Sequence, residues 1–461
     1  MRLEYRKFRP LIATLFVTLV CFGVAEGRTT PANGKFIIGD PESLGFSSER
    51  LKRLDAIMQQ SIEDHEYSGV VTLLARHGKI VSFSSLGSQD LETRVPMSHD
   101  TIFRIASMTK PMTAAAMMIL YEEGKWTLQD PVAKFIPEFS DLQVYAGRAD
   151  LMGKLQLESP THEPTLLELM THTAGFSYGL EETPAERLYR DDSDKSIFGI
   201  GSLQMMIARL SAAPLLYQPS THWKYSLSSD IQGYIIEKLS RVTFPQFLKT
   251  RLFEPLGMSD TDFYVPEEKR KRFAALYQVK DDARTLERVQ PDAIPYGDYA
   301  KMPALAFGGA GLVSTAVDYF RFCQMLLNGG QLDGVRVLSP GTVKLILSNH
   351  LPESLMADYK GAGFVTQPRP GLGYGFGGAV VTDPGLAGTL MGKGSYLWDG
   401  AFGTWFWVDP TNDIVFIGMV QRYCWIARPC STTQKSRAGI PPNLEELSRA
   451  LTYQALLRPE K

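Results

Sequence analysis

Ser107 and Lys110, a serine and a lysine three residues apart, are the side chains of this sequence with the clearest potential for chemistry. Proline is tolerated in a helix only within the first turn, so Pro111 predicts that Ser107 lies at a helix N-terminus. Residues at this spacing face the same side of the turn. A serine hydroxyl is a weak nucleophile, and a lysine whose pKa is lowered by burial can activate it. The pair alone is weak evidence, because a serine cap followed by a solvated lysine gives the same pattern.

Two further segments carry groups that such a nucleophile requires. Tyr225 stands before a helix-like segment, and a tyrosine hydroxyl that reaches the Ser–Lys pair can relay a proton to the leaving group. Residues 396–404 are glycine-rich and lead into an apolar strand, where glycine lets a substrate approach the backbone. Backbone N–H groups of this strand and of Ser107 are candidates for the two halves of an oxyanion hole.

In their order and spacing these segments resemble the serine β-lactamase-like family, which includes class C β-lactamases, DD-peptidases and the family VIII carboxylesterases. The resemblance extends over about residues 45–455 and includes three supporting segments, residues 166–175, 307–315 and 407–410. It implies that Ser107 is the nucleophile, that Lys110 is its base partner, and that Tyr225 matches the tyrosine of the Tyr-x-Asn motif.

The glycine-rich segment also has a counterpart in this family. Trp398 and Gly400 match the Trp-x-Gly that some of the esterases carry in place of Lys-Thr-Gly. The resemblance therefore implies that Trp398, Gly400 and Leu227 border the substrate. It implies Ala401 as the second backbone donor of the oxyanion hole.

Two departures from the β-lactamase pattern bear on the substrate. Leu227 stands where β-lactamases carry an asparagine that helps to hold the lactam. Trp398 replaces the lysine that binds the carboxylate of penicillins, and such a charge-assisted hydrogen bond contributes about 1.5–3 kcal/mol. Both changes favour esters with short to medium acyl chains. Lys393 is a possible replacement cation, so a side activity on β-lactams stays open.

The order of the predicted elements indicates an α+β fold. One antiparallel sheet flanked by helices is built from both chain ends, with a large all-helical domain inserted between them. We assign residues 46–106 and 341–461 to the sheet domain, residues 107–340 to the mostly helical domain, and residues 26–45 to a linker. A site at the seam between the two domains is expected, because clefts commonly form there.

Residues 1–25 have the pattern of a signal peptide, with four basic residues, an apolar run and the small-x-small end Gly23-Val24-Ala25. We therefore expect a periplasmic or secreted protein with no stable membrane span after cleavage. An uncleaved N-terminal anchor is the alternative.

Composition excludes several classes of function. The net charge is −2, which argues against nucleic acid as a partner. The seven histidines show no metal-ligand spacing, so neither a metal nor an organic cofactor is expected, and the expected partner is a small-molecule ester.

Cys323 is predicted to be a buried core residue, and Cys424 and Cys430 are candidates for a disulfide. The oligomeric state stays open.

A second serine matches a different catalytic motif. Ser177 lies in Gly175-Phe176-Ser177-Tyr178-Gly179, the Gly-x-Ser-x-Gly pattern of α/β-hydrolases, which needs a strand before it and a helix after it. Here a helix is predicted before it and a loop after it, so we do not assign Ser177 as the nucleophile. His172 is interpreted as a structural histidine and Asp230 as a helix or loop anchor.

Two rival functions remain beside the esterase hypothesis. One is a β-lactamase or DD-peptidase that acts on β-lactams or peptidoglycan peptides. The other is a non-catalytic member of the fold that binds peptidoglycan or a protein partner. The presence of Ser107, Lys110 and Tyr225 together argues against the second, because binding alone does not need all three residue types.

Overall fold

The structure is a computed structural model that describes residues 37–150, 153–190, 201–279, 285–290, 294, 297–357, 368–423 and 443–458. The signal-peptide prediction for residues 1–25 lies outside the described residues, as do the predictions for Cys424 and Cys430. The description concerns the unit Gly34–Lys461.

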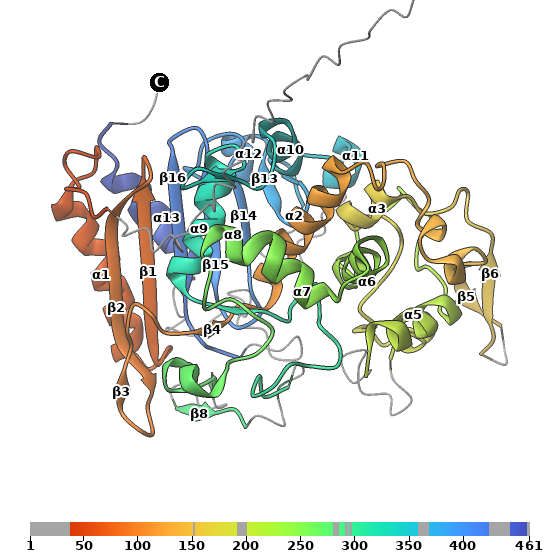
Figure 1. Cartoon of the computed structure of the whole chain (residues 1–461), viewed down its shortest axis with the longest axis horizontal. Coiled ribbons are helices and arrows are strands. Elements are labelled where there is room, and N and C mark those ends of the chain that lie inside the picture. Colours follow the sequence, from red (N-terminus) through yellow and green to blue (C-terminus); the bar gives the residue numbers. More distant parts are fainter. Residues whose placement is uncertain are drawn as a thin grey trace, which may run out of the picture. The chain divides into compact units, whose positions relative to one another are not determined.

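The centre of this unit is an eight-stranded antiparallel sheet with the order β12-β13-β14-β15-β16-β1-β2-β3 (Figure 1). Its strands are β1 (Gly69–Arg76), β2 (Lys79–Asp90), β3 (Val95–Pro96), β12 (Leu372–Tyr374), β13 (Ala379–Val381), β14 (Tyr396–Asp399), β15 (Trp405–Asp409) and β16 (Ile414–Met419). β1 pairs with β16 from Val71 opposite Met419 to Arg76 opposite Ile414. This pairing joins the two chain ends and confirms the predicted sheet.

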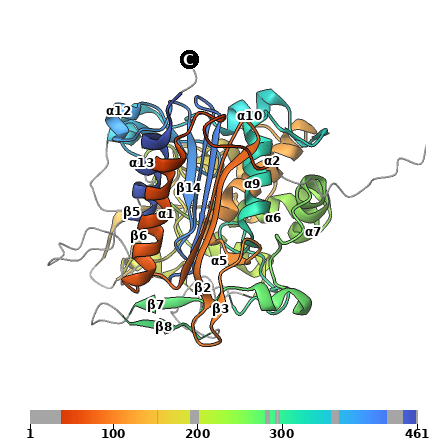
Figure 2. The same ribbon diagram turned by 90° about the vertical axis from the view of Figure 1, so that its left-hand side faces the viewer.

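Helices cover both faces of the sheet, which explains why every residue of β1 and β16 is buried. Figure 2 shows α1 (Ser48–Glu63) and α13 (Leu444–Ala455) on one side of the sheet, and α2 (Thr109–Glu122) and α9 (Ala316–Leu327) on the other. Within α1 the buried positions Leu51, Leu54 and Met58 follow the helical period. Cys323 is fully buried within α9, as predicted.

The inserted segment is mostly helical, but its described part also contains three hairpins that the sequence interpretation missed. Its helices after α2 include α3 (Leu166–Thr171), α5 (Leu203–Ala212), α6 (Ser228–Ser240), α7 (Phe244–Leu248) and α9. The hairpins pair β5 (Val144–Ala149) with β6 (Leu155–Glu158), β7 (Tyr277–Val279) with β8 (Leu286–Arg288), and β10 (Gln331–Leu332) with β11 (Val335–Arg336). Most of β5 and β6 is exposed or half-buried, so these strands lack the apolar alternation that marks a strand in sequence.

Two other features bear on the predicted organisation. The end of the predicted linker contacts the sheet domain, since Ile38 bridges to Ile80. Across the described ranges, no helix is long and apolar enough to cross a bilayer.

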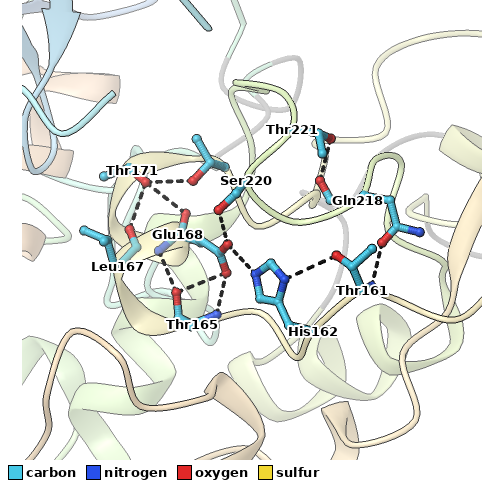
Figure 3. Close-up of polar contacts among 10 residues, drawn as sticks. Thr161, His162, Thr165, Leu167, Glu168, Thr171, Gln218, Ser220 and Thr221 are labelled. Carbon is cyan, nitrogen blue, oxygen red and sulfur yellow. Dashed lines mark hydrogen bonds and ion pairs between the residues drawn. The ribbon is translucent and has the colours of Figure 1, made fainter. Parts of the chain in front are cut away.

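A buried carboxylate in α3 anchors the loop that carries Tyr225 (Figure 3). Glu168 forms a capping box with Thr165 and accepts hydrogen bonds from the Thr165 N–H group at 2.7 Å and from the Ser220 hydroxyl. His162 Nε2 lies 2.7 Å from the same carboxylate. Because the Ser220 N–H group also donates to the Thr173 carbonyl, the loop is attached to the end of α3 at several points.

We expect the Glu168→Ala substitution to lower the free energy of unfolding by about 2–3 kcal/mol, because it removes a buried, charged acceptor of the hydrogen bonds from Thr165 and Ser220. Denaturant unfolding followed by circular dichroism measures this change. Glu163→Ala, at an exposed neighbouring position, is the matched control and should be nearly neutral. Equal stability of the two variants would show that the Glu168 network does not anchor the loop.

Candidate active site

Ser107 lies where the chain enters its most buried helix. β4 (Phe103–Arg104) pairs with β9 (Val313–Ser314), and a single 3-10 turn, Ala106–Met108, then leads into α2. Ala106 has a φ of 41°, an uncommon conformation for a residue with a side chain, and Ser107 is the only partly exposed residue of the turn. The Tyr319 hydroxyl donates to the Met108 carbonyl at 2.9 Å. Ser107 is therefore presented at the helix N-terminus, as the position of Pro111 predicts.

The side chain of Lys110 points back toward this serine from the first turn of α2. It is 1% exposed, and its Nζ atom lies 3.3 Å from Ser107 Oγ and donates to the Gly309 carbonyl at 2.7 Å. Burial lowers the pKa of Lys110 to about 7, although the charges of Asp230 and Asp399 favour its protonated form. A substantial fraction of this amine is therefore uncharged near neutral pH.

A glycine allows three polar side chains to meet beside Lys110. A Cβ atom on Gly309 would lie 2.9 Å from Asp230 Oδ2, 2.9 Å from the Tyr178 hydroxyl and 3.2 Å from Lys110 Nζ. Asp230 Oδ1 accepts the Gly309 N–H group at 2.9 Å, which fixes the carbonyl that holds Lys110. Burial raises the pKa of Asp230 to about 6, while the charge of Lys110 acts in the opposite direction. The interpretation of Asp230 as an anchor fits this geometry.

Tyr178 and Gly309 are site residues that sequence reasoning missed. Tyr178 stands inside the Gly-x-Ser-x-Gly segment, and Gly309 stands in a segment that only the family resemblance marked. No local pattern connects either residue to Lys110, because tertiary packing alone brings them together.

Tyr225 reaches the Ser–Lys pair from the loop before α6. Lys110 Nζ lies 4.4 Å from the centre of its ring, and the ring centroids of Tyr225 and Trp398 are 5.6 Å apart. Burial, followed by the nearby Tyr374, raises the pKa of the Tyr225 hydroxyl well above its usual value, while contacts with Ser107 and Trp398 lower it. The structure thus brings together Ser107, Lys110, Tyr225 and Trp398 from three separate segments.

The turn after β14 lies against the backbone that precedes Ser107. A Cβ atom on Gly400 would lie 2.4 Å from the Ile105 carbonyl oxygen, so only glycine fits this approach. The Gly403 N–H group donates to the Gly400 carbonyl at 2.8 Å and closes the turn. Ala401 is exposed within the turn, and its N–H group donates to no residue in the described part of the chain. This arrangement is compatible with the predicted role of Ala401 as an oxyanion donor.

The structure places Leu227 in the core and Lys393 at the surface. The side chain of Leu227 is 0% exposed and belongs to the main core, so it offers no surface to a substrate in this structure. Lys393 is exposed in the loop before β14.

Aromatic rings form one wall of the site. The Tyr374 ring lies 5.4 Å from Trp398 and 5.6 Å from Trp223 between centroids. His172 packs against Tyr374 at 5.5 Å and has its Nδ1 atom 3.0 Å from Ser226 Oγ. Burial, followed by the charge of Lys110, lowers the pKa of His172 well below its usual value. An uncharged, packed histidine agrees with its interpretation as structural.

Ser177 lacks the exposed hydroxyl and the preceding strand that a nucleophile elbow requires. Its hydroxyl is buried and donates to Glu186 at 2.6 Å, and the element before it is helix α3 rather than a strand. Among the described residues, no group of three or more His, Cys, Asp or Glu side chains is placed to hold a metal ion.

Comparisons with known proteins agree with this architecture. The family model for beta-lactamase matches residues 54–433. Esterase EstB of Burkholderia gladioli is 31% identical over 387 residues, which are 80% of this chain and 90% of EstB. An uncharacterised Mycobacterium tuberculosis protein is 37% identical over 362 residues, 77% of this chain and 86% of its own.

A solved structure extends the likeness to three dimensions. EstCE1, a hydrolase with promiscuous acyltransferase activity, superposes with a TM-score of 0.70 at 27% identity, over 90% of this chain and 99% of its own. The fold is the beta-lactamase fold of a hydrolase with esterase relatives, and the chain belongs to the beta-lactamase family.

Proposed function

We propose that this protein is a serine carboxylesterase that cleaves esters with short to medium acyl chains through an acyl-enzyme on Ser107. The observation that carries the proposal is the placement of the buried Lys110 amine 3.3 Å from Ser107 Oγ. A neutral amine can accept the hydroxyl proton as the serine attacks, and burial makes the neutral form available. The esterase EstB, at 31% identity, supports ester hydrolysis over other chemistry of the family.

The proposed reaction has two acyl-transfer steps. Ser107 Oγ attacks the ester carbonyl carbon while its proton passes to Lys110 Nζ, and the resulting oxyanion accepts hydrogen bonds from the N–H groups of Ser107 and Ala401. The helix N-terminus also favours this negative charge. As the carbon–oxygen bond to the alcohol breaks, Tyr225 delivers a proton to the departing oxygen and regains one from Lys110. Water then attacks the acyl-enzyme by the same route and releases the carboxylic acid.

Asp230 acts in this scheme as a positioning residue. It holds Gly309, whose carbonyl accepts a hydrogen bond from Lys110, and its carboxylate faces the same small space as Nζ. When Lys110 takes up the serine proton, the nearby carboxylate stabilises the ammonium ion.

The aromatic wall favours a neutral substrate. Trp398 stands where β-lactamases carry the lysine that holds a carboxylate, and its buried ring cannot replace the charge-assisted contact of that lysine. This argues for esters over β-lactams. EstCE1 has acyltransferase activity, so transfer of the acyl group to an alcohol instead of water is a second outcome of the same acyl-enzyme.

Replacing Ser107 with Ala should reduce the hydrolysis of p-nitrophenyl butyrate by about a thousandfold or more, and Lys110→Met should reduce it by about a hundredfold or more. Initial rates of the purified variants measure both effects. Ser177→Ala is the matched control and should retain most of the activity. A fluorophosphonate adduct mapped by mass spectrometry should lie on Ser107, and an adduct on Ser177 would overturn the assignment.

The pH dependence of kcat/KM reports the proton on Lys110. The base is the uncharged amine, and its lowered pKa of about 7 places the loss of activity on the acid side, as the pH falls through that value. Rates with p-nitrophenyl butyrate from about pH 5 to 9 test this expectation. A profile that is flat through neutrality, or that rises toward acid, contradicts a neutral lysine base.

The Asp230→Asn substitution should move this acid limb to lower pH, because it removes a negative charge that favours protonated Lys110. Asparagine keeps an acceptor for the Gly309 N–H group, so the fold should persist, and kcat should fall by about tenfold. Asp141→Asn, at an exposed position before β5, is the control for the charge change. An unchanged pH profile in Asp230→Asn would leave Asp230 with a structural role only.

A further inference from the structure

A cavity of about 520 Å³ lies between the β2–β3 turn, β4 and the β7–β8 hairpin. Its lining includes Arg104 from β4, Phe273 and Leu276 from the segment before β7, and Val289 after β8. Neither Ser107 nor Lys110 belongs to this lining. The volume is in the range of cavities that hold small ligands.

The main polar group of the cavity is a buried arginine. Arg104 is 6% exposed, and its Nη1 atom donates to the Ala274 carbonyl at 2.8 Å and to Gln421 Oε1 at 3.1 Å. Its guanidinium carbon lies 3.9 Å from the centre of the Phe273 ring. No carboxylate of the described residues forms an ion pair with Arg104, and its Nε atom has no hydrogen-bond partner. A buried charge without a counter-ion is costly, and a bound anion would offset that cost.

The rest of the lining adds positive charge. Arg270 and Lys271 are exposed at its edge, and the hydrogen bonds of the Arg270 side chain go to the backbone carbonyls of Val265 and Ala300. Arg288 is paired with Asp90 at 3.1 Å and with Glu92 at 2.8 Å. Arg288 thus engages Asp90 and Glu92, while the charge of Asp298 acts on Arg104 from an exposed position. The cationic side chains of Arg104, Arg270 and Lys271 remain for a ligand.

The opposite wall of the cavity is apolar. Leu276, Val289 and Ile294 line it and form one small core cluster with Ala106 and Phe402. Ala106 precedes Ser107, and Phe402 follows Ala401, so this wall is the back of the two turns that border the catalytic serine. A ligand with an apolar part would pack here.

We propose that this cavity binds a small organic anion, whose carboxylate head pairs with Arg104, Arg270 and Lys271 and whose short apolar body packs against Val289 and Ile294. An arginine fork matches a carboxylate in geometry as well as in charge. The site is separate from the Ser107 centre and takes an acid rather than an ester.

Isothermal titration calorimetry with hexanoate, and with hexanamide as the uncharged counterpart, tests the proposal. Hexanoate should bind the full-length protein, and hexanamide should bind at least tenfold more weakly. Arg104→Met should weaken hexanoate by about tenfold to a hundredfold, the loss expected for a charge-assisted hydrogen bond. Lys125→Gln, an exposed position outside the cavity, should leave binding unchanged.

Because Arg104 also supports the backbone, the double variant Arg270→Gln/Lys271→Gln gives an independent test at exposed positions, and it should weaken hexanoate severalfold. If hexanoate bound in the Ser107 site instead, none of these substitutions would change its affinity. No binding of hexanoate, equal binding of hexanamide, or equal affinity of the double variant and Lys125→Gln would overturn the proposal.

Discussion

The removal of the Lys110 amine from water is the constraint on which the rest of this site depends. An exposed lysine is protonated at neutral pH and cannot take a proton from serine. Here α2 carries the amine into the protein interior, and the transfer from water lowers its pKa to about 7. The charges of Asp230 and Asp399 oppose this lowering of the pKa. Near neutral pH the amine is therefore present in both its protonated and its uncharged form.

The fold is organised so that this buried amine faces one hydroxyl. The segment around Gly309 is hydrogen-bonded to α2 at two points. The Thr113 hydroxyl donates to the Gly308 carbonyl at 2.6 Å, and the Thr109 hydroxyl accepts the Leu312 N–H group at 3.1 Å. The central sheet brings the Gly400 turn to the opposite side of Ser107, and glycine is required there because the Ile105 carbonyl leaves no space. Three distant parts of the chain therefore position one atom pair.

Much of this arrangement could be predicted from local sequence. Pro111 indicates the start of a helix, and the apolar strands at both chain ends indicate a sheet that joins them. The family resemblance then identified Tyr225 and the Trp398 segment. The proximity of Tyr178, Asp230 and Gly309 to Lys110 could not be predicted, because it arises from packing between elements that are far apart in sequence. The β5–β6 and β7–β8 hairpins were missed since their short strands carry little apolar alternation. The cavity at Arg104 was missed because its lining comes from segments separated by more than a hundred residues.

The central claim concerns the proton on a single nitrogen, and nuclear magnetic resonance can observe that nitrogen directly. A titration of the protein labelled at the lysine Nζ and Cε atoms, with Lys110 assigned from the spectrum of Lys110→Arg, measures its pKa in the absence of substrate. A midpoint near 7 for Lys110, well below the ordinary lysine value of about 10, is the result that the structure predicts. A Lys110 midpoint at or above that of the exposed lysines would contradict the account.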